Sequence, residues 1–251
     1  PEVASGGTGP VTLGGLLVQQ TAEFLAAATL TQAMSPGAPI LCGTVSSVLD
    51  MKSGMHAYGA IESALINAAT AQISDYYDLP CRGTAGTDAC VPDMQSGYES
   101  ALTLIYGALA GMTYFHYTVG HLEFTRTVSY EHLVAGNEVL GMVSRALKGI
   151  DLNGLDSAVD LINEIGPGGL FLTHRHTREH FREEHFIPEL SNRKSFDAWK
   201  KEGRKEVKEV AREKVLKLLK EHQPAPLDKS VERELLEVVK KIEERELKKS
   251  V

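Results

Sequence analysis

Up to about residue 150, short apolar or β-prone runs alternate with long stretches rich in alanine and leucine. A loop of glycine, serine, threonine and aspartate separates each apolar run from the stretch that follows. This alternation is typical of β/α units, in which helices cover parallel strands. We expect strands at residues 39–45, 80–85 and 112–119, and helices at 13–34, 58–77, 93–110 and from Ser129 onward.

The number of units predicts half of a TIM-type (β/α)8 barrel. Four units are present if a shortened first strand near Pro1 is counted, whereas a complete barrel needs eight in roughly 250 residues. An open half-barrel exposes two parallel edges, so we expect the missing strands to come from an N-terminal half of the barrel or from a partner chain. The chain has no initiator methionine and starts at a glycine-rich turn, residues 6–9, which also indicates a fragment.

The pattern changes after residue 150 to helical segments with many charges. Helices are expected at 155–165, 173–184, 196–222 and 231–247, the last two with Glu and Lys four residues apart. We interpret residues 1–190 as the C-terminal half of the barrel with closing helices, and residues 191–251 as a charged amphipathic tail. An apolar stripe in this tail predicts packing across the barrel or against a second subunit. We expect a homo-oligomer.

Composition and charge exclude several classes of protein. The net charge is −7; residues 1–170 hold 5 basic against 16 acidic residues, and residues 171–251 hold 21 against 17. The acidic block should repel polyanions, so no nucleic-acid partner is expected. No apolar run reaches the roughly 18 residues of a membrane span, and residues 1–3 lack the basic start and apolar region of a secretory signal. Three cysteines without CxxC spacing indicate reduced thiols in a cytoplasmic protein.

The loops after the predicted strands are the places to look for chemistry. In a β/α barrel these loops form the active face. The third unit brings Thr84 and Asp88 there, and the fourth brings His121 and Glu123. Each of these residues could instead cap a helix or shape a loop.

Aromatic residues gather in the fourth unit. Residues 114–117 read Tyr-Phe-His-Tyr, and Phe124 lies in the following loop beside Glu123. Aromatic faces beside a carboxylate attract a quaternary ammonium, which cannot donate hydrogen bonds. The alternative is that these rings pack on both faces of a barrel strand. His116 is expected to point into the barrel if Tyr114 does.

A cluster of histidines raises the question of a metal site. His176 and His180 lie four residues apart on a predicted helix, with His174 before them, and zinc sites use this spacing. Interleaved arginines would repel a dication and no HExxH motif is present. We therefore assign no metal ligand and favour a solvated or interface helix.

Several motifs, in order along the chain, resemble trimethylamine methyltransferases and their glycine-betaine-type relatives. They are the stretches 39–54, 83–97 (GTAGTDACVPDMQSG), 120–124 (GHLEF) with 129–131, and 168–174 (GGLFLTH) with 180–184 (HFREE). The likeness covers essentially the whole chain.

This resemblance implies a TIM-barrel enzyme that demethylates a small methylated amine and passes the methyl group to the cobalt(I) of a separate corrinoid protein. The corrinoid, a cobalamin, would be carried by that partner, and none would be bound tightly to this chain. Trimethylamine members of the family carry pyrrolysine, which this sequence lacks; the residue has been lost or replaced, or it lies in the missing half. A quaternary amine such as glycine betaine is therefore favoured, with trimethylamine possible.

The candidate site residues follow from the loops, the aromatic strand and the resemblance together. The candidate catalytic residues are Asp88, His116, His121 and Glu123, and the candidate substrate-binding residues are Thr84, Tyr114, Tyr117 and Phe124. The alternatives to an enzyme active with its missing half are a non-catalytic barrel subunit or binding module, and a histidine-ligated metalloenzyme.

Overall fold

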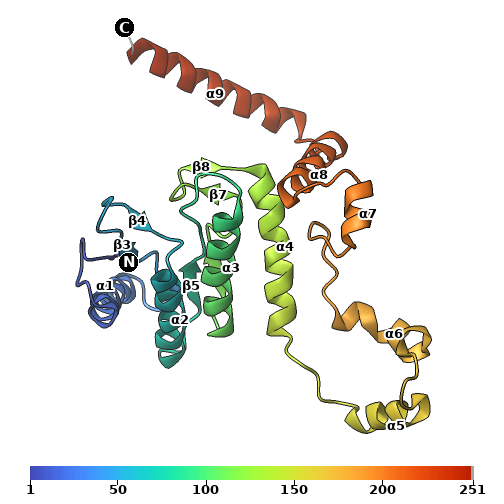
Figure 1. Cartoon of the computed structure of the whole chain (residues 1–251). Coiled ribbons are helices and arrows are strands. Elements are labelled where there is room, and N and C mark those ends of the chain that lie inside the picture. Colours follow the sequence, from blue (N-terminus) through green and yellow to red (C-terminus); the bar gives the residue numbers. More distant parts are fainter. Residues whose placement is uncertain (250–251) are drawn as a thin grey trace. The chain divides into compact units, whose positions relative to one another are not determined.

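The computed structural model describes residues 1–249, and it divides into two compact units, residues 1–215 and the segment from 216 onward. The elements in chain order (Figure 1) are β1 (Ala4–Ser5), α1 (Leu13–Met34), β2 (Cys42–Gly43), β3 (Ser47–Leu49), β4 (His56–Ala57), α2 (Ile61–Tyr76), β5 (Cys81–Thr84), α3 (Met94–Leu109), β6 (Tyr114–His116), β7 (His121–Leu122), β8 (Thr127–Val128), α4 (Tyr130–Leu147), α5 (Leu155–Ile165), the 3-10 helix η1 (Phe171–Thr173), α6 (Arg175–Glu184), α7 (Phe196–Lys201), α8 (Val207–Glu221) and α9 (Lys229–Lys249). The protein is thus mixed α/β.

The principal strands are parallel, as the sequence predicted. β2 pairs with β5, and β5 pairs with β6, both in parallel register. β1 pairs in parallel with β3, placing Ala4 opposite Ser47. Helices α2 and α3 connect successive strands of this arrangement, which is the β/α alternation expected from the sequence. The described strands form no closed barrel.

Residues 42–49 act as one extended segment with neighbours on both sides. The amides of Cys42 and Thr44 donate to carbonyls of Pro80 and Arg82, on the β5 side. The amide of Ser47 donates instead to the carbonyl of Val3, on the β1 side. The ladders are short because the segment changes partners along its length, and β3 then turns back antiparallel into β4.

The core lies between the strands and the helices that follow them. Val3, Leu16 and Ile66 bring β1, α1 and α2 together, each almost fully buried. Burial of each such side chain contributes about 2 kcal/mol. A second cluster joins the β5–α3 region to α4 through Ala85, Leu104, Ala108 and Val143.

Helix starts follow the local sequence. Asp93 and Ser96 form a reciprocal capping box at the start of α3, with Asp93 Oδ1 accepting from the Ser96 amide at 3.0 Å. Ser129 caps α4 by accepting from the His132 amide at 3.1 Å. Such caps satisfy amides that have no partner inside the helix.

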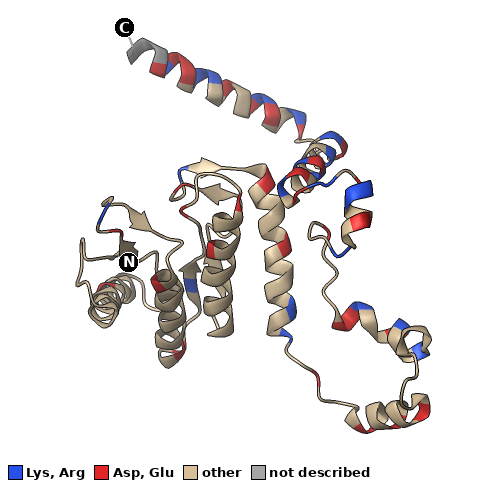
Figure 2. Ribbon diagram, in the orientation of Figure 1, with Lys and Arg blue, Asp and Glu red and all other residues tan. Residues whose placement is uncertain are grey.

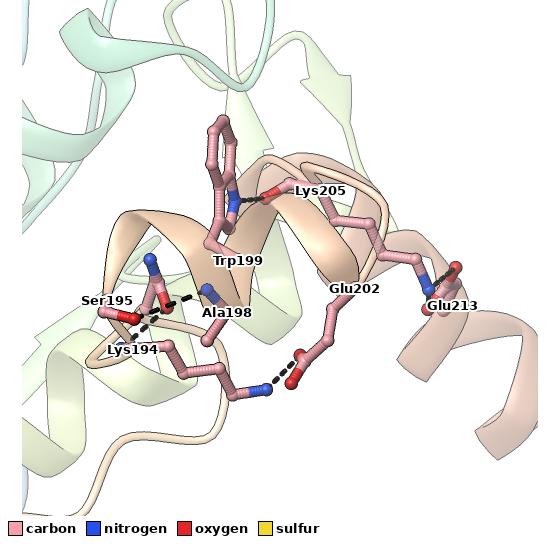
Figure 3. A network of polar contacts seen from close by, with 8 residues as sticks. Lys194, Ser195, Ala198, Trp199, Glu202, Lys205 and Glu213 are labelled. Atoms are coloured by element: carbon pink, nitrogen blue, oxygen red, sulfur yellow. Dashed lines mark hydrogen bonds and ion pairs between the residues drawn. The ribbon is translucent and has the colours of Figure 1, made fainter.

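The helix predicted at residues 196–222 is wrong, because two helices occupy this range. α7 ends at Lys201 and α8 begins at Val207. Gly203 has φ +96° and Arg204 has φ +59°, so the backbone between the helices is left-handed and cannot continue a helix. Figure 3 shows the Trp199 indole donating to the carbonyl of Lys205 at 2.8 Å across this break, with Lys205 paired to Glu213 of α8.

A carboxylate on α4 holds the segment that precedes α7. Glu138 accepts hydrogen bonds from the amides of Glu189, Leu190 and Ser191 and from the Ser191 hydroxyl. Leu190 packs beside it with Val134, and with Ala211 of α8. This contact fastens a chain segment without secondary structure of its own to the helical part of the unit.

Charged residues are unevenly distributed over the elements. Figure 2 shows few of them on the strands and on α1 to α3, whereas α8 and α9 alternate basic and acidic residues along most of their length. Among the described residues, no helix combines the length and the apolar character needed to cross a membrane.

Candidate functional site

The carboxyl ends of the parallel strands bring three loops together. β5 ends at Thr84 and is followed by the loop that contains Asp88, while β6 ends at His116 and is followed by Tyr117. The β3–β4 hairpin is followed directly by Tyr58. The Tyr58 amide donates a hydrogen bond to Asp88, which places Tyr58 at the same edge. Loops at the carboxyl ends of parallel strands are where α/β enzymes place their sites.

The two faces of β5 and β6 have different roles. Gly83 and Phe115 are register partners on the face toward the helices, where Phe115 packs against Gly107 of α3. Arg82 and Tyr114 form the next pair, and Thr84 and His116 another, on the opposite face. His116 and Tyr114 therefore share the face that the helices do not cover, as their spacing predicted.

Asp88 joins the loops after β4 and β5. Its carboxylate accepts from the amides of Tyr58 at 2.9 Å and Gly59 at 3.1 Å. The buried Glu99 of α3 braces the same loop by accepting from the Thr87 hydroxyl at 2.6 Å and the Asp88 amide at 2.8 Å. Gly59 leaves room for this carboxylate, since a Cβ would lie 2.4 Å from Glu99 Oε2.

Burial gives two groups at this edge unusual acidities. It raises the pKa of Asp88 to about 6; the amides of Gly59 and Tyr58 oppose the shift, and the charge of Glu99 adds to it. Burial, together with a hydrogen bond to Glu2 at 3.0 Å, raises the pKa of Tyr58 to about 12. A half-buried carboxylate that changes charge near neutral pH is a common feature of functional sites.

A row of side chains runs from Arg82 to His121. Arg82 Nη2 lies 2.7 Å from His116 Nδ1. The ring centroids of His116 and Tyr117 are 3.7 Å apart, and those of Tyr117 and His121 are 5.0 Å apart. Tyr117 has φ +57°, so the chain bends directly after β6 and folds the tyrosine ring back onto His116.

His116 of this row favours the neutral form. Burial lowers the pKa of His116, and the nearby charges of Arg82 and His121 lower it further. Burial likewise lowers the pKa of His132, which lies on α4. His121 Nδ1 is buried without a hydrogen-bond partner among the described residues, so one polar atom of the row is left unsatisfied.

Two further predicted site residues, Thr84 and Tyr114, differ in exposure. Thr84 is buried, and its hydroxyl donates to the carbonyl of Thr44 at 3.4 Å, so it contributes to strand packing. Tyr114 is exposed, with its ring 6.5 Å from that of His116.

Glu123 and Phe124 lie in the hairpin between β7 and β8. Both have positive φ, and the Glu123 carboxylate accepts from the Thr127 hydroxyl within the hairpin at 2.7 Å. The Glu123 amide donates to the carbonyl of Ala89 at 2.9 Å, which ties this hairpin to the Asp88 loop. The described geometry thus shows Glu123 as a residue that shapes the hairpin.

The histidines of α6 lie apart from this edge. The rings of His176 and His180 are 4.5 Å apart, and His174 caps the helix and lies 3.7 Å from Glu164. Within residues 1–249, no group of three or more His, Cys, Asp or Glu side chains is placed to hold a metal ion.

Comparison with known proteins identifies the family. The sequence profile described as "Trimethylamine methyltransferase (MTTB)" matches residues 1–246. The chain belongs to this family. It is 37% identical over 234 residues to a glycine betaine methyltransferase of Desulfitobacterium hafniense, covering 93% of this chain and 49% of the relative. It is also 37% identical over 241 residues to the trimethylamine methyltransferase MttB1 of Methanosarcina mazei, covering 94% and 48%.

Membership of the trimethylamine methyltransferase family confirms the resemblance seen in the sequence. The chain spans about half the length of the curated relatives it matches, and it corresponds to their C-terminal half. The loops at the carboxyl ends of β5 and β6 consequently belong to a protein whose relatives are twice as long.

Sequence reasoning missed three residues that shape this edge. Arg82 was assigned only to a strand, although it has the same parity as Thr84 and is one of few basic residues before position 170. Tyr58 and Glu99 were assigned to helices, and nothing local indicated that they contact the Asp88 loop. For Arg82, strand parity was a usable signal; for Glu99, only the packing of α3 against the loop reveals the role.

Proposed function

We propose that this chain is the C-terminal half of a (β/α)8-barrel methyltransferase that moves a methyl group from a methylated amine to the cobalt of a corrinoid protein. The observation that carries the proposal is the cluster of Asp88, Tyr58, His116 and Tyr117 at the carboxyl ends of parallel strands, in a chain of this family. A quaternary amine such as glycine betaine is the favoured substrate class.

The chemistry asks little acid or base catalysis of the protein. When a methyl group leaves a quaternary ammonium, the carbon–nitrogen bond breaks and its electron pair stays on nitrogen, which becomes a neutral tertiary amine. The electron pair of the new bond to the methyl carbon would come from the cobalt(I) of the corrinoid partner. No proton is transferred, and this is consistent with a site of rings, one half-buried carboxylate and the neutral His116.

The residues of the edge suit the binding of such a cation. The faces of Tyr117 and His116 offer aromatic surface, and ring faces attract a cation that cannot hydrogen-bond. Asp88 offers a negative charge once it is ionised, held in place by two backbone amides. The role of these side chains is to hold the ammonium in line for transfer and to exclude water.

The number of parallel segments in the chain supports the proposal that a second half completes the barrel. Four parallel segments, at residues 1–5, 42–49, 81–84 and 114–116, follow one another in chain order, as they do in an arc of a β/α barrel. The segments at the two ends of this arc, residues 1–5 and 114–116, each pair with one of the other three segments. We infer that the remaining four strands come from the N-terminal half of the full-length protein.

The decisive experiment is a methyl-transfer assay on the full-length protein that contains this chain. Purified protein is mixed with reduced cobalamin and one amine at a time: glycine betaine, trimethylamine or choline. We expect cob(I)alamin to be converted to methylcobalamin with a quaternary amine, followed by absorbance, and the demethylated amine to appear in equal amount. Absence of transfer from every amine, with the protein's own corrinoid partner also supplied, would refute the proposal.

A further inference from the structure

Arg82 stands out among the side chains on the uncovered face of the strands. It is half-buried on β5, in register with Gly43 on one side and Tyr114 on the other. A Cβ at position 43 would lie 3.1 Å from Arg82 Cβ and 3.6 Å from its Cδ. The glycine thus leaves room for the aliphatic stem of the arginine to lie across the neighbouring strand.

One side of the guanidinium is held by a neutral histidine. Arginine can only donate hydrogen bonds, so His116 Nδ1, 2.7 Å away, must accept and its proton must sit on Nε2. Burial and the charge of Arg82 favour this neutral form. A single neutral acceptor orients the planar guanidinium but does not neutralise its charge.

The carboxylates at this edge are engaged elsewhere. Asp88 accepts from two backbone amides, Glu99 from Thr87 and the Asp88 amide, and Glu123 from Thr127. Among residues 1–249, Arg82 forms no ion pair with any Asp or Glu. A half-buried arginine with spare donors is costly unless an anion completes it.

The residues around Arg82 indicate what kind of ligand would carry this anionic group. The histidine that orients Arg82 lies against Tyr117, with ring centroids 3.7 Å apart, and the tyrosine ring is one wall of the proposed ammonium site. An anion receptor and an aromatic cation receptor are therefore separated by one imidazole ring. A small zwitterion, with a carboxylate and a quaternary ammonium a few bonds apart, matches both.

We propose that Arg82 binds the carboxylate of the substrate and selects betaine-type amines over methylated amines that lack a carboxylate. The guanidinium fork suits a carboxylate because it can donate two parallel hydrogen bonds. This inference rests on the proposed function and assigns the specificity of the same site to one residue. Trimethylamine and tetramethylammonium have nothing for Arg82 to bind.

The test compares substrates with and without a carboxylate in the full-length protein that contains this chain. R82Q, R82K and wild type are assayed for methyl transfer to cob(I)alamin from glycine betaine and from tetramethylammonium. We expect R82Q to raise the KM for glycine betaine by about tenfold or more while changing that for tetramethylammonium little, with R82K intermediate. R126Q, at an exposed position in the β7–β8 hairpin, is the matched control.

Isothermal titration calorimetry with glycine betaine distinguishes a failure of this inference from a failure of the proposed function. Tight binding by wild type and weak binding by R82Q, with no transfer from any amine, supports the carboxylate site and refutes the methyltransferase. Equal losses of methyl-transfer activity on both substrates in R82Q and R82K, with unchanged melting temperatures, would overturn the inference. Arg82 would then support transfer in a way that does not depend on the carboxylate of the substrate. Preference of the wild type for tetramethylammonium would overturn it as well.

Discussion

At the scale of the residue, Asp88 carries the strongest electrostatic signal of the edge. Burial in the loop after β5 raises its pKa to about 6, and the carboxylate of Glu99 adds to the shift. A raised pKa means that the folded protein binds the proton more tightly than the unfolded chain does. Ionisation of Asp88 therefore costs folding free energy as pH rises from about 4 to 6, a cost expected where a negative charge serves function.

The pH dependence of methyl transfer should report on this group. A quaternary ammonium has no titratable proton, so a fall in kcat/KM below about pH 6 would reflect protonation of the protein. We expect wild type to show that fall, and D88N to be pH-independent and lower at pH 7, on the order of tenfold.

Two further variants sharpen the assignment. E99Q should move the acidic fall to lower pH, because removing a neighbouring negative charge makes Asp88 easier to ionise. D50N, in the exposed turn after β3, should leave the profile unchanged. An unaltered acidic fall in D88N would show that another group titrates.

At the scale of the element, single polar side chains fasten segments that have no secondary structure. Glu138 of α4 is the clearest case, since its one carboxylate accepts hydrogen bonds from three consecutive amides at residues 189–191. Burial by itself would raise the pKa of Glu138, but the hydrogen bonds from Ser191 and the three amides outweigh it and the net shift is downward. The contact is consequently retained until pH falls through a pKa below the usual value.

Removing this carboxylate should loosen the segment. We expect E138A to lower the free energy of unfolding by about 2 kcal/mol, since hydrogen bonds to a charged group are lost together. Amide hydrogen exchange at residues 189–191 should accelerate in the same variant. N137A, exposed on the neighbouring position of α4, should change neither quantity; equal behaviour of the two variants would contradict the role assigned to Glu138.

At the scale of the whole molecule, the proposed half-barrel would leave strand edges for the other half to pair with. β6 pairs with β5 on one side, and β1 pairs with β3 on one side. Unpaired edge strands recruit other chains. The relatives of this chain are about twice its length.

This predicts a difference in association between the chain and the full-length protein. We expect the 251-residue chain expressed alone to sediment as a mixture of large species, and co-expression with the N-terminal half to yield one discrete species. Sedimentation velocity of both preparations is the measurement. A monodisperse, thermally stable chain without its complement would show that the edges are already satisfied.

Much of the fold could be predicted because its signals are local. The alternation of apolar runs and amphipathic stretches gave the order of strands and helices, and Asp93 and Ser129 marked helix starts through their own side chains. The motifs at residues 83–97 and 120–124 identified the family. The helix break after α7 was also local, but Gly203 was outweighed by the surrounding run of good helix formers.

The sequence by itself determined the family, the β/α order and the loop in which Asp88 lies, because these depend on residues close together in the chain. His121 was expected in a loop as well, but it begins the short strand β7. Only the tertiary structure decided which side chains meet. Arg82 and His116 are 34 positions apart and come together through the register of β5 and β6. Glu99 reaches the Asp88 loop because α3 folds back over it. Hydrophobic periodicity states which face of an element is buried, but the partner across that face is set by packing.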